Sequence, residues 1–85
     1  MSWRIEWTNR ALRDVERLDR RERERVFRAV DRIAETKHGD LRLLQGQRDT
    51  WRLRVGELRV ILELDRTNNL TRLERVLPRG RAYRR

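Results

Sequence analysis

The sequence contains no cysteine, and it has only one proline, one histidine and one lysine. Without cysteine, neither a disulfide framework nor a thiol nucleophile is possible. His38 is the single imidazole, so the usual zinc ligand sets of cysteine and histidine cannot be assembled. We therefore expect no metal site.

Long apolar runs are also absent. The longest is Val60 to Leu62, far shorter than the ~20 residues that span a bilayer or the ~7 to 15 of a signal-peptide core. We expect a cytoplasmic protein without membrane contact. Leu, Ile, Val and Phe nevertheless make up 22 of the 85 residues, above the fifth or so below which highly charged chains stay disordered. The sequence predicts one folded domain, residues 1–85, with a thin core.

The sequence has many charged residues, and basic ones are in excess. It contains 22 Arg and one Lys but only 14 acidic residues, which gives a net charge of +9. Residues up to Asp40 carry a net +2, and the remainder carries +7. Such an excess favours polyanionic partners such as nucleic acid. A GC-rich genome is an alternative explanation for the preference of Arg over Lys.

Apolar periodicity in the first half predicts a strand followed by two helices. Trp3, Ile5 and Trp7 alternate with charged residues, which is typical of a strand with one buried face. Thr8 is a suitable cap for a helix that continues to Leu18. A second helix follows the capping box of Asp19 and Glu22 and stops before Gly39. Its apolar positions are Val26, Phe27, Val30, Ile33 and Ala34.

The second half changes to a period of two, which predicts three strands: Trp51 to Val55, Leu58 to Leu64, and Leu70 to Leu77. Gly56-Glu57 is a two-residue hairpin turn with Gly first, and Pro78 should end the last strand. The fold class is α+β: an N-terminal strand, two helices, then a three-stranded antiparallel meander. We expect one twisted sheet with both helices on one face.

The hairpin turn sets a register that brings arginines together. It places Arg54 opposite Arg59 and groups both with Arg52 on the face away from the helices. Like charges directly opposite destabilise a sheet, so an anion should sit there. The planar guanidinium fork matches phosphate oxygens, so a phosphodiester suits this cluster. The alternative is that these side chains are solvated and screened by salt.

Arg79, Arg81 and Tyr83 follow the last strand directly. A short extension there could fold back over the open sheet face beside Arg54 and Arg59. Tyr83 is the only tyrosine, and it lies in a basic tail rather than on an apolar stripe. The alternative interpretation is that Tyr83 is simply an aromatic residue near the end of the chain that packs partly against the domain.

Taken together, these segments resemble the RelE/ParE superfamily of bacterial toxins from toxin-antitoxin pairs. The likeness covers essentially the whole chain and rests on "WRIEWTNRALRDVERLD", "RVFRAVDRIAE", "LRLLQG", "WRLRVGELRVILELD" and "VLPRGRAY". The hairpin with Arg59, and Arg79 followed four residues later by Tyr83, is similar to the ribosome-dependent mRNA-cleaving branch. Two departures are that the strand positions are often Lys in the family, and that many relatives have His or another polar residue at Pro78.

The resemblance implies an endoribonuclease that cuts mRNA in the ribosomal A site without metal or small-molecule cofactor. Its partners would be the ribosome, mRNA and a cognate antitoxin, with no membrane involved. Arg59 and Arg79 would clamp the scissile phosphate, with Arg52 and Arg54 as further RNA-binding residues. Tyr83 would be the general base.

Elementary chemistry agrees with these roles. Arginine, with a pKa above ~12, is a poor base, whereas neighbouring arginines lower the pKa of tyrosine from its usual value near 10. Arg81 or Arg79 would then donate the proton or stabilise the transition state. Three alternatives stay open: a gyrase inhibitor of the ParE type without nuclease activity, a non-catalytic basic RNA-binding module, and an inactive family member.

Overall fold

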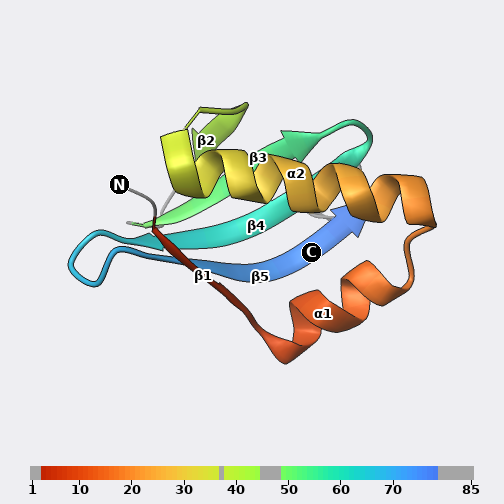
Figure 1. Ribbon diagram of the computed structural model, residues 1–85, viewed down its shortest axis with the longest axis horizontal. Helices are drawn as coiled ribbons and strands as arrows, with labels where there is room; N and C mark the ends of the chain where they lie inside the picture. Colours follow the sequence, from red (N-terminus) through yellow and green to blue (C-terminus); the bar gives the residue numbers. More distant parts are fainter. Residues whose placement is uncertain (1–2, 37, 45–48, 79–85) are drawn as a thin grey trace.

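The computed structural model describes residues 3–36, 38–44 and 49–78, which form two helices on one side of a five-stranded sheet (Figure 1). The strand order is β1-β5-β4-β3-β2. The elements are β1 (Arg4–Trp7), α1 (Asn9–Glu16), α2 (Arg20–Thr36), β2 (Leu41–Leu43), β3 (Thr50–Val55), β4 (Leu58–Asp65) and β5 (Leu70–Pro78). The predicted α+β class is confirmed. None of the described helices is both long and apolar enough to cross a bilayer.

Both helices begin at the predicted caps. The Thr8 hydroxyl accepts a hydrogen bond from the Ala11 N–H at 3.1 Å, and the Asp19 carboxylate accepts one from the Glu22 N–H at 2.8 Å. Each cap satisfies an amide that has no partner within its helix. The first helix ends two residues earlier than the predicted Leu18.

The predicted hairpin register is confirmed. Val55 pairs with Leu58 and Arg54 with Arg59 across the turn, where Gly56 has a φ of +60°. A positive φ at the first turn residue alone is the pattern of a type II′ turn, which glycine adopts without steric cost.

Three features of the sheet were not predicted. β2 adds a short antiparallel edge strand beside β3, and β1 lies parallel to β5. β5 also carries a bulge, because Ile61 pairs with Arg75 while Leu62 pairs with Leu73. The extra residue lets Leu73 and Val76 both face the helices although three positions separate them.

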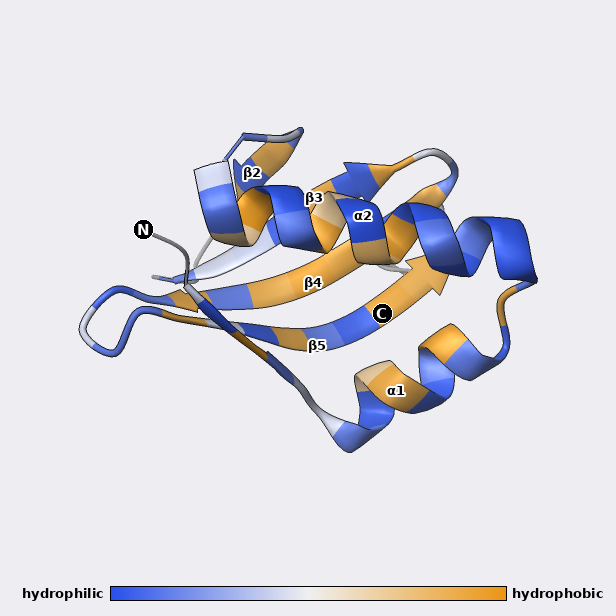
Figure 2. Cartoon of the chain, in the orientation of Figure 1, coloured by the Kyte–Doolittle hydropathy of each residue, from blue (hydrophilic) through white to orange (hydrophobic). Residues whose placement is uncertain are grey.

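The core lies between the helices and one face of the sheet (Figure 2). Alternate residues of β3 and β4 are buried there against α2, whose Val26, Val30 and Ile33 are at most 1% exposed. The three tryptophans pack at the margin of this core, as expected. Phe27 was predicted within the apolar stripe of the second helix, but it is 39% exposed, and Leu12 on α1 is 43% exposed. Phe27 instead makes an edge-on contact with Trp7, with ring centroids 5.3 Å apart.

Helix α1 satisfies the part of the β5 edge that β1 leaves open. β1 pairs with β5 only as far as Leu73. Beyond it, the Thr8 hydroxyl donates to the Glu74 carbonyl at 3.1 Å, and Asp14 accepts the Val76 N–H at 2.9 Å. Asp14 is 8% exposed and also accepts from the Arg75 guanidinium at 2.8 and 3.2 Å. Side chains of α1 thus replace a neighbouring strand along the end of β5.

The contact between Asp14 and β5 makes the stability of the fold depend on pH. Burial raises the pKa of Asp14, but the hydrogen bonds from Arg75 and Val76 outweigh it and hold the pKa below its usual value. The stabilisation is therefore present above about pH 4 and is lost as the pH falls through the lowered folded-state pKa. We expect Asp14→Asn to lower the free energy of unfolding by about 1–3 kcal/mol at pH 7 and by less at pH 3. Urea denaturation at both values measures this.

The matched control is Asp31→Asn, which removes an exposed carboxylate from α2. It should change stability little at either pH. Equal effects of the two substitutions at pH 7 would contradict a special role for Asp14.

Candidate nucleic-acid interface

Four arginines gather on the sheet face that the helices do not cover. The register confirms that Arg52, Arg54 and Arg59 share this face, and β2 adds Arg42 opposite Arg52. Arg54 stands opposite Arg59 in the next row. We call these four residues the arginine face. Arg42 was missed because a three-residue strand has too little alternation to be recognised from sequence.

The other end of the same sheet face is neutralised. Arg72 on β5 donates to Glu6 of β1 at 2.8 Å and to Glu63 of β4 at 2.7 Å. These hydrogen bonds raise the pKa of Arg72, the bond to Glu6 having the largest effect, although partial desolvation acts in the opposite direction. Among the described residues no such ion pair involves Arg42, Arg54 or Arg59. Arg54 and Arg59, at the hairpin end of the sheet, therefore carry positive charge that no ion pair among the described residues compensates.

Together with Arg23 and Thr71, Arg59 is one of three described residues with a buried polar side-chain atom that no hydrogen bond satisfies. Its Nε is buried and has no hydrogen-bond partner among the described residues. Leaving a buried charged donor unsatisfied is costly, because the group has lost water without gaining another acceptor. A guanidinium binds phosphate through two parallel hydrogen bonds, so the Arg59 side chain suits an anionic oxygen ligand.

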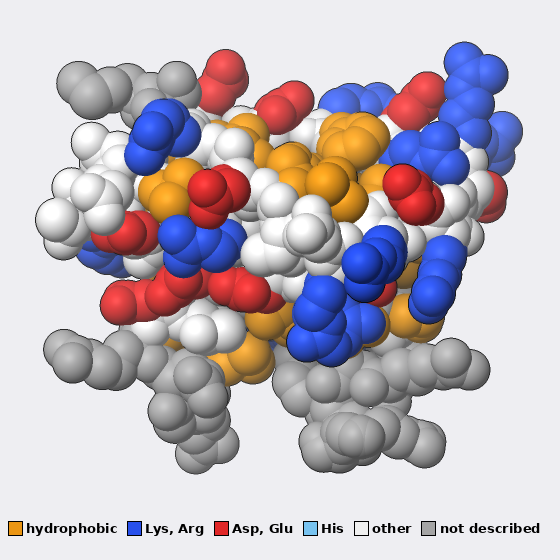
Figure 3. Space-filling model, turned by 90° about the horizontal axis from the view of Figure 1, so that it is seen from below, with side chains coloured by type: hydrophobic (Ala, Val, Ile, Leu, Met, Phe, Trp, Pro, Cys, Tyr) orange, Lys and Arg blue, Asp and Glu red, His pale blue; other side chains and the backbone are white. Residues whose placement is uncertain are grey.

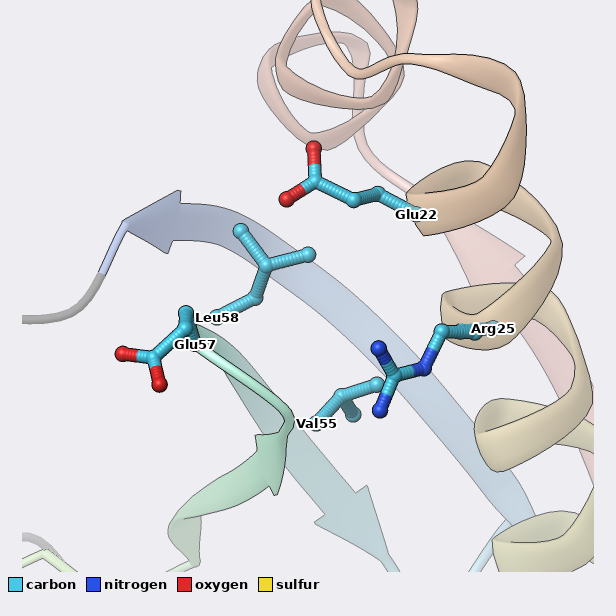
Figure 4. A pocket seen from close by; sticks show the side chains of 5 residues that line it. All are labelled: Glu22, Arg25, Val55, Glu57 and Leu58. Atoms are coloured by element: carbon cyan, nitrogen blue, oxygen red, sulfur yellow. The ribbon is translucent and has the colours of Figure 1, made fainter.

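Helix α2 supports the hairpin that carries Arg54 and Arg59. A cavity of about 60 Å³ lies between them, lined by Glu22, Arg25, Val55, Glu57 and Leu58 (Figure 4). Arg25 reaches from α2 toward the turn, so that a Cβ added to Gly56 would lie 3.2 Å from its Nη2. The glycine thus permits close packing of the hairpin tip against the helix.

Arg79, Arg81 and Tyr83 lie outside the described residues, so their roles remain predictions. The chain does lead to them from the arginine face. Leu77 pairs with Arg59, and Pro78 pairs with Leu58 at the hairpin end. Within the described ranges, acidic and histidine side chains nowhere form a group of three that could hold a metal ion.

Residues 5–83 match the family model described as "ParE toxin of type II toxin-antitoxin system, parDE". The chain belongs to this family. It is a toxin of a type II toxin-antitoxin system and a member of the RelE/ParE superfamily. No curated protein sequence matches the chain.

Solved toxin structures share the fold across nearly the full length of both chains. The archaeal RelE–RelB complex from Pyrococcus horikoshii OT3 superposes with a TM-score of 0.82 at 22% identity, covering 95% of this chain and 99% of that one. The RelBE2 complex from Mycobacterium tuberculosis gives 0.80 at 21%, with coverages of 93% and 100%. The intact E. coli RelBE complex gives 0.79 at 18%, with coverages of 94% and 100%. At these identities the likeness establishes the fold.

The like-charged pair across the hairpin should cost stability. We expect Arg54→Gln to raise the free energy of unfolding by roughly 0.2–1 kcal/mol in low salt, because it removes the repulsion with Arg59. The gain should shrink as sodium chloride screens the repulsion in the unchanged protein. Urea denaturation of both proteins at several salt concentrations measures the effect.

Arg66→Gln is the control, since Arg66 is exposed in the turn between β4 and β5. It removes the same charge without a facing arginine. A loss of stability in Arg54→Gln would show that packing of its aliphatic stem outweighs the repulsion.

Proposed function

We propose that this toxin is a metal-independent endoribonuclease that cleaves mRNA in the ribosomal A site and so inhibits translation. The observation that carries the proposal is the arginine face, with the buried Arg59 Nε lacking a partner among the described residues. The shared fold with RelE toxins supports the same choice. The proposed target implies a cytoplasmic toxin.

The reaction requires three proton and charge movements. The ribose 2′-OH loses its proton and attacks the adjacent phosphorus, negative charge develops on the phosphoryl oxygens, and the 5′-oxygen is protonated as its bond to phosphorus breaks. The products are a 2′,3′-cyclic phosphate and a free 5′-OH. Arg54 and Arg59 suit the second requirement, because fixed guanidinium donors stabilise the developing charge without reorganising.

The remaining roles fall to the residues that follow β5. Tyr83 is the proposed base, since arginines nearby would lower its pKa and favour the phenolate. Arg81 or Arg79 would protonate the leaving oxygen, and Arg79 would join Arg59 in holding the phosphate. Arg52 and Arg42 would bind the flanking RNA backbone.

An antitoxin partner follows from membership of a type II toxin-antitoxin family. Several matching structures are complexes of a RelE toxin with its RelB antitoxin. We propose that the antitoxin of this toxin uses a flexible segment with acidic and apolar residues, because it would complement the net charge of +9. Covering the arginine face would block access of RNA.

Inhibition of DNA gyrase is the second candidate function. It is favoured by one observation, the match of residues 5–83 to the ParE model. This activity would need a protein-binding surface and no general base. The two functions therefore differ in their dependence on Tyr83.

Cell-free translation distinguishes them. We expect the unchanged toxin to cut mRNA at the A-site codon of stalled ribosomes, detected by mapping mRNA ends. Arg59→Ala should slow cleavage by roughly 10²–10³-fold, the usual effect of removing one donor to a developing oxyanion. Tyr83→Phe should abolish cleavage at neutral pH, because its ring lacks the proton-accepting oxygen.

Arg66→Ala, in the β4–β5 turn, serves as the control and should cleave normally. Wild-type cleavage by Tyr83→Phe would end the assignment of the base. If mRNA stays intact and the toxin inhibits supercoiling by purified gyrase, the proposed nuclease activity is wrong and gyrase inhibition is the function.

A further inference from the structure

A second group of arginines surrounds a cleft on the opposite side of β5 from β4. Arg10, Arg13 and Arg17 line one face of α1, and Arg75 faces them from β5; with Asp14 they enclose about 130 Å³. Figure 3, seen from below, shows basic side chains gathered right of centre on this side of the molecule. We call this the α1 arginine cleft. Arg75 is 30% exposed, and the three α1 arginines are exposed.

The charge of this cleft is not neutralised from within. Both carboxylate oxygens of Asp14 are already used by Arg75 and the Val76 N–H. Although Arg17 helps to lower the pKa of Asp14, no ion pair among the described residues joins Arg10, Arg13 or Arg17 to an acid. Glu16 lies three residues from Arg13, about 60° around the helix, but no ion pair among the described residues joins the two. Three like charges thus lie along one side of α1 and its C-cap residue, Arg17.

Helix α2 shows what a self-compensated arginine row looks like. There Glu24 lies between Arg20 and Arg28, at 3.4 Å and 4.0 Å. Pairs of this spacing stabilise a helix, whereas like charges three or four residues apart destabilise it. On α1, Asp14 lies at similar spacings from Arg10 and Arg17, but its carboxylate oxygens accept hydrogen bonds from Arg75 and the Val76 N–H instead, and the first turn of α1 contains no acidic residue. An external anion is the partner that fits.

The cleft continues toward the arginine face. A larger depression of about 490 Å³ shares Asp14, Arg17 and Arg75 with it and extends to Leu77 and Pro78 at the end of β5, with Glu22 and Glu57 also in its lining. Leu77 pairs with Arg59. The end of β5 therefore lies between the arginine face and the α1 arginine cleft. A polyanion that passes around the end of this strand would contact both groups.

We propose that the α1 arginine cleft binds the phosphate backbone of an RNA strand, beyond the segment that lies on the arginine face. This inference rests on the proposed action on RNA. The cleft holds phosphates by charge and hydrogen bonding without reading bases, so it adds affinity for long strands and leaves the chemical step unchanged. A free phosphate ion would meet only part of this row, whereas a strand offers repeated charges along it.

Binding measurements on strands of two lengths test the proposal. The probes are fluorescent 2′-O-methyl oligonucleotides of 4 and 16 nucleotides, which the toxin cannot cleave because the attacking hydroxyl is blocked. Fluorescence anisotropy with the Arg10→Gln/Arg13→Gln/Arg17→Gln variant should show roughly ten- to a hundredfold weaker binding of the 16-mer at 0.1 M salt, and a salt slope smaller by about 2. Binding of the 4-mer should change little.

The matched control is Arg21→Gln/Arg28→Gln/Arg32→Gln, which removes three exposed arginines from α2. If it weakens the 16-mer equally, overall charge explains the effect and the cleft is not a site. Inorganic phosphate at matched ionic strength should compete weakly; full competition would assign the cleft to free phosphate and overturn the proposal.

Two further results separate this inference from the proposed function. Failure of the unchanged toxin to cleave mRNA, with the length-dependent loss intact, would reject the nuclease and keep the RNA contact. Unchanged 16-mer binding by the α1 variant would reject the cleft whatever the outcome of the cleavage assay. Loss of gyrase or antitoxin binding instead of RNA binding would assign the surface to a protein and overturn the proposal.

Discussion

The buried carboxylate of Asp14 is the contact on which the attachment of α1 to the sheet depends. It accepts hydrogen bonds from the Val76 N–H and from Arg75, where β1 no longer covers the edge of β5. One side chain therefore satisfies the sheet edge and holds α1 against the sheet, while its hydrogen bonds go to β5 rather than to Arg10, Arg13 or Arg17. It also fixes the strand from which the chain continues to Arg79, Arg81 and Tyr83.

The arginines of this chain have different structural roles, depending on whether an acidic side chain lies within reach. Arg72 and Arg75 are tied to carboxylates from other elements and join strands or layers. Arg54 and Arg59 face one another instead, and the fold tolerates their repulsion because the sheet beneath them has a well-buried apolar face. A high net charge alone does not reveal this division; the pairing of individual side chains does.

Local patterns were sufficient to predict the hairpin and the helix starts. Gly56-Glu57 between two alternating segments determines the register, and Thr8 and Asp19 act through contacts within three residues. β2, the parallel pairing of β1, and the bulge in β5 depend on distant neighbours, so no local pattern indicated them. For the same reason the sequence did not show that Arg42 joins the arginine face or that Arg75 turns toward α1.

The parallel pairing of β1 with β5 joins the first strand of the described chain to the last one, some 66 residues apart in the paired side chains of Glu6 and Arg72. Contacts of such long range form late, because the loop between them must first be closed. During synthesis, the sheet stays open until β5 has left the ribosome. The contact of α1 with β5 and the completed core therefore form only after β5 has emerged, so a partly made chain lacks the assembled surface that the finished toxin presents.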